Sequence, residues 1–302
     1  MLKELVIVSG KGGTGKTSVT ASFAVLADNS VLCDAEVDAA DLHVLMAPVV
    51  RKSHAVMGGS LASVRQNDCV QCGRCLELCK FDAISDEFQV DPLSCEGCGV
   101  CVDLCPEKAI DFKVQQCGEW YQSDTRFGPM VHARLGIAEE NSGKLVSLVR
   151  QEARKLAESK NCEIIVTDGP PGIGCPVIAS IGGATALVIV VEPTVSGLHD
   201  MRRVAELAVH FKVPGLVVVN KFDLNPAMTG EIEAYAKERN MQLVGRIPFD
   251  HVFTKAMIQG KSVLEYAPES DAAIALLDVW RRIENSPSMN AMGIQDFSAV
   301  IQ

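Results

Sequence analysis

The chain has 302 residues, of which 48% are hydrophobic and 22% charged, and its formal net charge is −10 at pH 7. This composition is typical of a globular protein, and the acidic balance argues against a nucleic-acid partner, which would need a basic surface. Because no apolar run reaches the roughly 18 residues of a membrane span, and because the first residues, MLKELVIVSG, lack the pattern of a signal peptide, we expect a cytoplasmic protein without stable membrane association.

Short β-branched runs that end at Gly or Asp alternate with helical patterns along the chain. The predicted strands are Leu5–Val8, Val31–Asp34, Ile164–Asp168, Ala186–Val191, Leu216–Asn220 and Val244–Ile247. The predicted helices are Lys16–Asp28, Ser142–Lys160, Leu198–Phe211, Thr229–Asn240 and Asp271–Asn285. Continuous apolar strands indicate a parallel sheet buried on both faces, and the alternation predicts a doubly wound, mostly parallel α/β fold.

The alternation stops between about residue 60 and residue 112, where the chain is rich in cysteine. Within this stretch CVQCGRCLELCKFDAI (69–84) aligns with CEGCGVCVDLCPEKAI (95–110), so the segment is an internal repeat. We expect a discontinuous main domain of residues 1–59 and 112–288, a small inserted α+β domain of residues 60–111, and an irregular tail of residues 289–302. Residues 117–146 are predicted to form a hairpin or loop region that returns to a helix.

The segment VSGKGGTGKTSVT (8–20) joins the first predicted strand to the first predicted helix and contains the pattern Gly-x-x-x-x-Gly-Lys-Thr. Its glycines let backbone N–H groups close around phosphates, and the helix N-terminus adds its positive dipole end. We expect Lys16 to pair with the β- and γ-phosphates of a nucleotide and Thr17 to bind Mg²⁺. The predicted contacts of this loop are Gly10, Lys11, Gly12, Gly13, Thr14, Gly15, Lys16, Thr17 and Ser18.

Acidic residues follow two of the predicted strands, in CDAEVDAADLH and in IIVTDGPPGIG. Asp168 is placed to hold Mg²⁺ through water. Asp34, Glu36 and Asp38 are placed where a switch segment would meet the γ-phosphate and the attacking water, which an acidic side chain can orient or deprotonate. The alternatives are a helix-capping role for Asp34 and Asp168 and a solvated loop carboxylate for Glu36.

The segments KGGTGKT, DAEVD and DGPPGIG together resemble the MinD/Mrp-type P-loop ATPases, a group that includes ParA-like partition proteins and the nitrogenase iron protein. The resemblance covers nearly all of the chain outside the insert. It implies ATP and Mg²⁺ as cofactors and a homodimer, or a heterodimer with a related ATPase. In this deviant Walker A motif the extra lysine, Lys11, is implied to reach the nucleotide of the other subunit; the alternative is a solvated turn lysine.

The same resemblance implies that the segments NKFD and IPFD approach the adenine, with Asn220 at the base edge. The residues carried over are Asn220, Lys221, Pro248, Phe249 and Asp250. Asn is also a common turn residue at the end of a strand, which is the alternative for Asn220. Glu36 stands where the family pattern has aspartate, and this departure implies slow hydrolysis.

Eight of the twelve cysteines fall in the repeat, each half of which reads Cys-x2-Cys-x2-Cys-x3-Cys. Three cysteines on a tight loop can hold three irons of a [4Fe–4S] cube, and in two-cluster ferredoxins the fourth ligand comes from the other half. The spacing predicts one cluster on Cys69, Cys72, Cys75 and Cys105, and a second on Cys95, Cys98, Cys101 and Cys79. The insert resembles a bacterial two-cluster ferredoxin. The alternatives are zinc, which is usually held by paired Cys-x2-Cys knuckles, and simple thiols.

Two further residues outside these motifs are candidates for a site. Cys175 lies seven residues after Asp168, and a cysteine at the same offset ligates a shared cluster in the nitrogenase iron protein, so Cys175 is a candidate interface ligand. The alternative is a packed, inert thiol. His132 lies between Arg126 and Arg134 and is either part of a partner site or a structural histidine.

These features favour an ATPase, with ATP hydrolysis coupled to a conformational change, that acts in metallocluster assembly or transfer with an acceptor or scaffold protein as its partner. The second hypothesis is an ATP-gated electron-transfer component, because the ferredoxin spacing fits it equally well. The third, a MinD/ParA-like spatial organiser, is disfavoured by the acidic charge and by a C-terminal tail without a basic amphipathic face.

Overall fold

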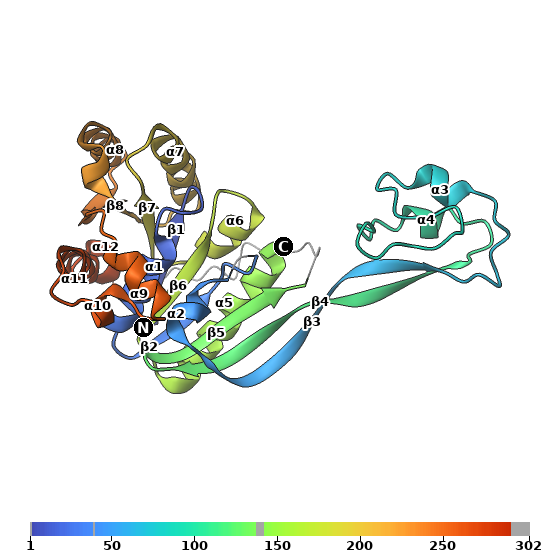
Figure 1. Ribbon diagram of the computed structural model, residues 1–302, viewed down its shortest axis with the longest axis horizontal. Helices are drawn as coiled ribbons and strands as arrows, with labels where there is room; N and C mark the ends of the chain where they lie inside the picture. Colours follow the sequence, from blue (N-terminus) through green and yellow to red (C-terminus); the bar gives the residue numbers. More distant parts are fainter. Residues whose placement is uncertain (1, 39, 137–141, 291–302) are drawn as a thin grey trace. The chain divides into compact units, whose positions relative to one another are not determined.

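The computed structural model describes residues 2–38, 40–136 and 142–290 (Figure 1). The chain divides into two compact units. The first unit comprises Met1–Ser53, Trp120–Arg134 and Ser142–Gln302, and the second comprises His54–Glu119 and Leu135–Asn141. The cysteine-rich range 60–111 lies within the second unit.

The described strands form one sheet in the order β3-β4-β5-β2-β6-β1-β7-β8-β9. From β5 to β9 all neighbouring strands are parallel. The six predicted strands are all present in this parallel part. The strand bounds are β1 (Lys3–Ser9), β2 (Ser30–Asp34), β3 (Val49–Val64), β4 (Ile110–Thr125), β5 (Gly128–Leu135), β6 (Ile164–Pro171), β7 (Ala186–Val191), β8 (Gly215–Asn220) and β9 (Gln242–Ile247).

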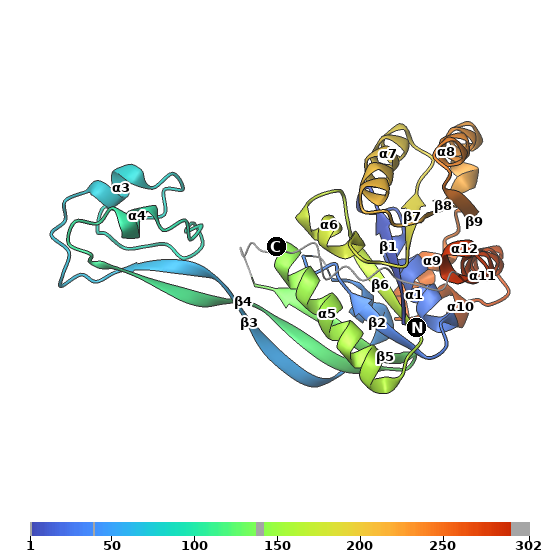
Figure 2. The ribbon, with the colours of Figure 1, turned by 180° about the vertical axis from the view of Figure 1, so that it is seen from behind.

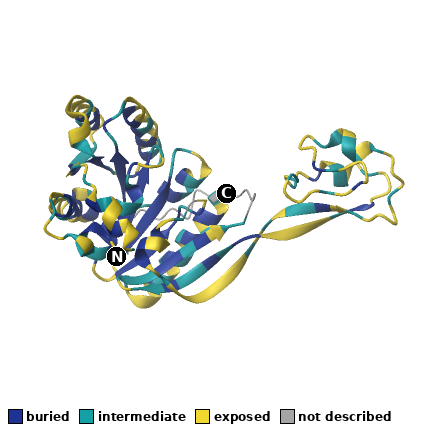
Figure 3. Ribbon diagram, in the orientation of Figure 1, coloured by how far each residue is buried: buried dark blue, intermediate teal, exposed yellow. Residues whose placement is uncertain are grey.

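Helices cover both faces of the parallel strands (Figures 1 and 2). Leu5 and Ile7 of β1 pack into a core with α1 and α11, whereas Val6 and Val8 pack with α6, α7 and α8 on the other face. The central strands are buried on both faces, as Figure 3 shows, and this explains their continuous apolar sequences. The helices are α1 (Lys16–Leu26), α2 (Leu42–Met46), α3 (Arg74–Leu78), α4 (Val100–Asp103), α5 (Ser142–Lys160), α6 (Cys175–Ile181), α7 (Val195–His210), α8 (Pro226–Glu238), α9 (Val252–Ile258), α10 (Val263–Tyr266), α11 (Asp271–Glu284) and α12 (Pro287–Asn290), with a 3₁₀ turn η1 at Phe222–Leu224.

Two long strands at one edge of the sheet were not among the six predicted strands: β3, and β4, whose second half falls in the predicted hairpin or loop region 117–146. Arg51 Nε lies 2.7 Å from Asp124 Oδ2, and Arg65 N lies 2.8 Å from Ala109 O, so the two strands run antiparallel. Most side chains of β3 are exposed, and an exposed strand carries no apolar run to reveal it. The predicted hairpin at residues 117–146 corresponds to β4, β5 and the start of α5.

Several predicted ends need correction: α7 begins at Val195 rather than at Leu198, and α8 spans Pro226–Glu238 rather than Thr229–Asn240. The first helix ends at Leu26 rather than at Asp28, because Ala27 is already extended. Residues 289 and 290 were expected in an irregular tail, but they complete α12, where Met289 is buried; the rest of that tail, 291–302, lies outside the described residues. None of the helices in the described ranges is long and apolar enough to cross a membrane.

The second unit repeats its backbone geometry as well as its sequence. Its helices α3 and α4 begin after Gly73 and Gly99, both with left-handed φ, of 78° and 75°. Asp82 and Lys108, which occupy equivalent positions of the repeat, both have φ of 49°. The N–H groups of Ala83 and Ala109 lie 3.4 and 3.3 Å from the sulfurs of Cys79 and Cys105. The two halves are therefore folded alike around their fourth cysteines.

A buried ion pair joins three elements of the first unit. Glu4 of β1 is 2% exposed and accepts hydrogen bonds from Arg150 of α5, at 2.7 and 2.9 Å, and from Arg154 at 3.0 Å. Arg150 Nη1 also donates to the carbonyl oxygens of Ala179 and Gly182, at 2.6 and 2.9 Å. Arg150 thereby links β1 and α5 to the C-terminal end of α6.

We expect Glu4→Gln to lower the free energy of unfolding by about 3–5 kcal/mol, because it leaves the buried guanidinium of Arg150 without its carboxylate. Glu233→Gln is the matched control, since Glu233 pairs with Arg246 near the surface, and its cost should be under about 1 kcal/mol. Urea unfolding measures both variants. Equal losses in the two would contradict this assignment.

Candidate functional site

The glycine-rich loop lies between β1 and α1, at the carboxyl edge of the sheet. Gly13 and Gly15 have φ of 80° and 88°, a conformation that favours glycine. Side chains are also excluded by contact, because a Cβ on Gly10 would lie 2.2 Å from Asp200 Cβ and one on Gly15 would lie 2.4 Å from Asn220 Nδ2. The glycines of the loop are therefore required by its backbone conformation and by the close approach of Asp200 and Asn220.

Four predicted residues meet at this edge. Lys16 Nζ lies 2.9 Å from Asp168 Oδ1 and 2.5 Å from Glu36 Oε2. Thr17 Oγ1 donates to Asp168 Oδ2 at 2.9 Å. Burial lowers the pKa of Lys16, but the carboxylates of Asp168 and Glu36 outweigh it, so the pKa lies above its usual value. The loop thus presents a charged ammonium, already paired with two carboxylates.

Asp34 lies beside Asp168, because β2 and β6 pair in a register that aligns the two residues. Its Oδ1 accepts a hydrogen bond from Glu36 N at 3.2 Å, while its fully buried Oδ2 has no hydrogen-bond partner among the described residues. Burial, followed by repulsion from Asp168, raises the pKa of Asp34 well above its usual value. Asp168 thus lies between the Thr17 hydroxyl and the unpartnered oxygen of Asp34, and these oxygens suit Mg²⁺, which prefers oxygen ligands.

The other switch acid, Asp38, has an exposed side chain. Burial also raises the pKa of Glu36 above its usual value, and Lys16 only partly opposes this. Of the three switch acids, Asp34 and Glu36 are therefore the two that the structure places against the phosphate loop.

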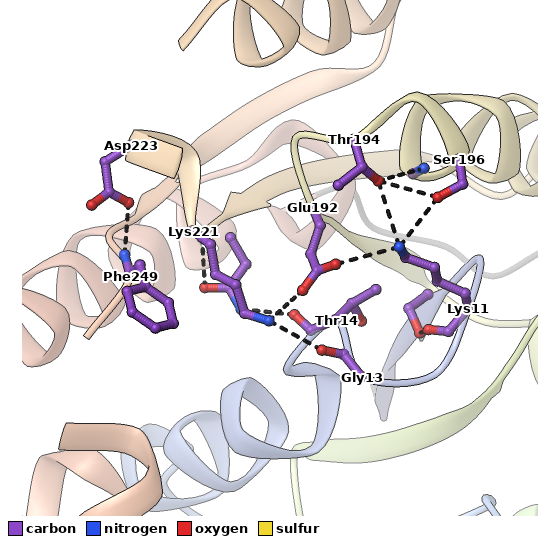
Figure 4. Close-up of polar contacts among 12 residues, drawn as sticks. Lys11, Gly13, Thr14, Glu192, Thr194, Ser196, Lys221, Asp223 and Phe249 are labelled. Carbon is purple, nitrogen blue, oxygen red and sulfur yellow. Dashed lines mark hydrogen bonds and ion pairs between the residues drawn. The ribbon is translucent and has the colours of Figure 1, made fainter. Parts of the chain in front are cut away.

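The extra lysine of the loop, Lys11, turns back onto its own chain at the end of β7 (Figure 4). Its Nζ lies 3.2 Å from Ser196 Oγ, 3.5 Å from Thr194 Oγ1 and 3.5 Å from Glu192 Oε2. The side chain is 34% exposed. Glu192 also forms an ion pair with Lys221, so the Glu192 carboxylate pairs with both Lys11 and Lys221.

The segment after β8 holds the phosphate loop from the side. Asn220 Nδ2 donates to Thr14 O at 2.7 Å, and Lys221 Nζ lies 3.2 Å from Gly13 O (Figure 4). In this structure the Asn220 amide thus positions the loop backbone, a role that the sequence analysis missed because no local pattern shows which strand end meets the loop.

The second adenine segment is organised by its own hydrogen bonds. Phe249 N donates to Asp223 Oδ1 at 2.7 Å (Figure 4). Asp250 Oδ1 accepts a hydrogen bond from the backbone N–H of Val252, the first residue of α9, at 2.9 Å. Pro248 is partly exposed, and the side chain of Phe249 is 43% exposed.

The two remaining candidates lie apart from these contacts. Cys175 is exposed at the first position of α6. His132 Nε2 is 2.8 Å from Ser123 Oγ, and its ring stacks on Tyr121 with centroids 5.0 Å apart. Burial, followed by the nearby His43, lowers the pKa of His132 to about 4. The contacts with Ser123 and Tyr121 hold the His132 ring in place, as expected for a structural histidine.

The cysteines of the second unit line two hollows. One is lined by Cys69, Cys72, Cys75 and Cys105, together with apolar side chains. The other is lined by Cys79, Cys95, Cys98 and Cys101. All eight thiols are free of disulfides. Among the described residues, no three His, Cys, Asp or Glu side chains are grouped as ligands of a metal ion.

A parallel sheet with a glycine-rich loop, a buried loop lysine and carboxylates at neighbouring strand ends defines a P-loop nucleotide-binding protein. Residues 5–263 match the family model of the CobQ/CobB/MinD/ParA nucleotide binding domain, and the chain belongs to this family. Its ATP-binding domain is therefore of the MinD/ParA type.

Several known proteins are similar to this chain. An uncharacterized protein of Methanocaldococcus jannaschii, MJ0578, is 35% identical over 228 residues, which cover 74% of this chain and 80% of the relative. The cytosolic Fe-S cluster assembly factor NUBP1 homolog of Caenorhabditis elegans is 26% identical over 140 residues, 40% of this chain and 45% of that protein. Less than half of that relative is thus matched.

The solved structures agree with the fold. The septum site-determining protein MinD of Pyrococcus horikoshii, complexed with Mg-ADP, aligns with a TM-score of 0.56 and 19% identity, over 94% of this chain and 97% of that one. A ParA family ATPase of Chlorobium tepidum aligns with a TM-score of 0.54 and 16% identity, over 93% and 99%. At these identities the likeness describes the fold.

We expect Asp34→Asn to gain stability relative to the wild type as the pH rises. The raised pKa means that folded Asp34 holds its proton more tightly than the unfolded chain does, so its contribution to stability falls as the pH rises from about 3.9 through the raised value. Asparagine has no proton to lose. Urea unfolding from pH 5 to pH 8, without nucleotide or Mg²⁺, measures the difference, with the exposed Asp28→Asn as control; a difference that does not change with pH would contradict this.

Proposed function

We propose that this protein is an ATP-hydrolysing iron–sulfur protein whose nucleotide state controls the assembly or transfer of a metallocluster. The observation that carries the proposal is the presence, in one chain, of a phosphate loop and of two hollows each lined by four cysteines. Such a function requires a nucleotide site and cluster-binding cysteines in one polypeptide, and the phosphate loop and the two sets of four cysteines supply the residues for both.

ATP binding would exchange the partners of Lys16. Without nucleotide, Glu36 and Asp168 neutralise the Lys16 ammonium. With ATP bound, Lys16 would turn to the β- and γ-phosphates. Thr17, Asp168 and Asp34 would then hold Mg²⁺ or the water bound to it. Mg²⁺, when bound, neutralises the developing charge of the transferred phosphoryl group. Glu36, released from Lys16, is then free to orient the attacking water.

The hollows of the second unit would hold two [4Fe–4S] clusters. Thiolates are the usual ligands of such clusters, and each set combines three closely spaced cysteines with a fourth from the other half of the repeat. The backbone N–H groups 3.4 and 3.3 Å from Cys79 and Cys105 would stabilise the negative charge of the ligated sulfurs. These bonds repeat in both halves, which supports equivalent roles for the two cysteines.

The role in cluster assembly has one further support. The relative from Caenorhabditis elegans carries the name cytosolic Fe-S cluster assembly factor, and it matches 40% of this chain. An ATP-gated electron-transfer component is the second candidate function, because Cys72 and Cys98 are exposed and would bring both clusters close to a redox partner. The likeness to MinD, at 19% identity, describes the fold and carries no argument about cell division.

The assignment of the cysteines predicts how double variants lose iron. The wild type should hold about eight iron atoms per chain, and a chain with one cluster about four. Because Cys69 and Cys105 are assigned to the same cluster, the double variant Cys69→Ser/Cys105→Ser should keep about four, whereas Cys69→Ser/Cys79→Ser should lose both clusters. Iron and sulfide analysis after anaerobic reconstitution measures this. The reverse result would show that the fourth cysteines do not cross.

The function is tested by cluster transfer from reconstituted protein to an apo-protein whose activity needs a [4Fe–4S] cluster. We expect Mg-ATP to accelerate the transfer about tenfold or more, a typical coupling between two sites.

Lys11→Ala should bind Mg-ATP like the wild type but lose ATP-dependent dimerisation, hydrolysis and this acceleration of transfer. The reason is that Lys11 is expected to leave its contacts near Glu192 and reach the nucleotide of a second subunit.

The exposed Lys212 lies outside the site, and Lys212→Ala is the matched control. No transfer by the wild type, with or without ATP, would refute the proposal. ATP-dependent reduction of a redox protein, without transfer, would favour the second candidate function instead.

A further inference from the structure

A buried hydroxyl outside the phosphate-loop motif contacts the central carboxylate of the site. Thr20 of α1 is fully buried, and its Oγ1 lies 2.7 Å from Asp168 Oδ1 and 3.0 Å from the backbone oxygen of Lys16. A hydroxyl has one proton, and a carboxylate is a stronger acceptor than a carbonyl. Thr20 therefore donates to Asp168.

Three side chains donate to Asp168 in the described part of the chain. Lys16 and Thr20 reach Oδ1 at 2.9 and 2.7 Å, and Thr17 reaches Oδ2 at 2.9 Å. Lys16 and Thr17 have other partners once a nucleotide is bound, because the ammonium turns to the phosphates and the Thr17 hydroxyl to Mg²⁺. Of these three donors, only Thr20 is not expected to bind the nucleotide or Mg²⁺, so it can keep its hydrogen bond to Asp168.

The helix itself places these donors. Thr20 lies three residues after Thr17 and four after Lys16, so its side chain lies next to theirs on the side of α1 that meets β6. The chain next to Asp168 has little freedom, because a Cβ on Gly169 would lie 2.7 Å from Ile7 O. With the backbone fixed, the orientation of the Asp168 carboxylate depends on its hydrogen-bond donors.

We propose that Thr20 is the positioning residue of Asp168: it keeps the carboxylate turned toward the Mg²⁺ position while Lys16 and Thr17 exchange their partners. The inference rests on the proposed binding of Mg-ATP. Residues that orient a metal-binding group without touching the metal typically change metal affinity 10–100-fold when they are mutated. Thr20 contacts neither nucleotide nor metal in this assignment, so its loss should change the requirement for Mg²⁺ and leave the phosphate contacts intact.

The test compares Thr20→Val, which keeps the size but removes the hydroxyl, with Thr20→Ser, which keeps it. In the full-length, cluster-reconstituted protein, we expect Thr20→Val to raise the Mg²⁺ concentration that gives half-maximal ATP hydrolysis by about tenfold or more. Binding of a fluorescent ATP analogue in the presence of a chelator should stay within about twofold of the wild type, because Lys16 and the loop amides are unchanged. Thr20→Ser should restore the wild-type Mg²⁺ requirement.

Thr167 offers a matched control on β6. It is fully buried next to Asp168, but its Oγ1 donates to Glu4 at 3.2 Å. Thr167→Val should lower thermal stability without changing the Mg²⁺ requirement. If Thr20→Val does not fold, Thr20→Ala replaces it. A wild-type Mg²⁺ requirement in the Thr20 variants, or an equal change in Thr167→Val, would overturn the positioning role. A wild type that does not hydrolyse ATP in the presence of Mg²⁺ would instead refute the proposed function.

Discussion

The ammonium of Lys16 is the charge on which the rest of the nucleotide site depends. Asp34 and Asp168 face each other from neighbouring parallel strands, and both are fully buried. Burial and repulsion from Asp168 raise the pKa of Asp34, and the charge of Asp168 must be compensated from within the protein. Lys16, only 5% exposed, supplies that compensation by pairing with Asp168 and Glu36. The glycines of the loop permit the backbone path that brings this lysine to the strand ends.

In the nucleotide-free site, the Lys16 ammonium is therefore already paired with an anionic group, the Glu36 carboxylate. Glu36 Oε2 lies 2.5 Å from Lys16 Nζ. A phosphate oxygen of a bound nucleotide would take the place of Glu36, so nucleotide binding would exchange one anionic partner of Lys16 for another without burying a new unpaired charge. Preorganised charge of this kind costs little reorganisation when the ligand arrives. The side chain released by the exchange belongs to the segment after β2. A local exchange of ion pairs is in this way linked to the position of a loop, as in other nucleotide-controlled switches.

The features predictable from sequence have local causes. The six predicted strands are continuous apolar runs because both faces of the sheet are buried, and the glycine-rich loop is marked by the backbone conformation it needs. The cysteine spacing anticipated the two sets that line the hollows, since each set derives from a short repeat. Strands β3 and β4 lacked an apolar run, and the contacts of Asn220 with Thr14 and of Thr20 with Asp168 join residues far apart in sequence. Such contacts depend on how strand ends meet, which no local pattern encodes.

The chain path shows where a nucleotide signal could leave the site. In sequence, the segment that carries Glu36 leads to α2, and α2 leads to β3, which continues into the second unit. The C-terminal end of α2 is held in the first unit, because Arg126 donates to Leu45 O at 2.7 Å and forms an ion pair with Glu265. Arg126 belongs to the turn between β4 and β5, and β4 is the strand that returns from the second unit. The chain thus leaves α2 into β3, and the turn that follows β4 contacts α2, the first helix after the switch acids. In chain order α2 therefore lies between the acids of the phosphate site and the first of the two strands that connect the units.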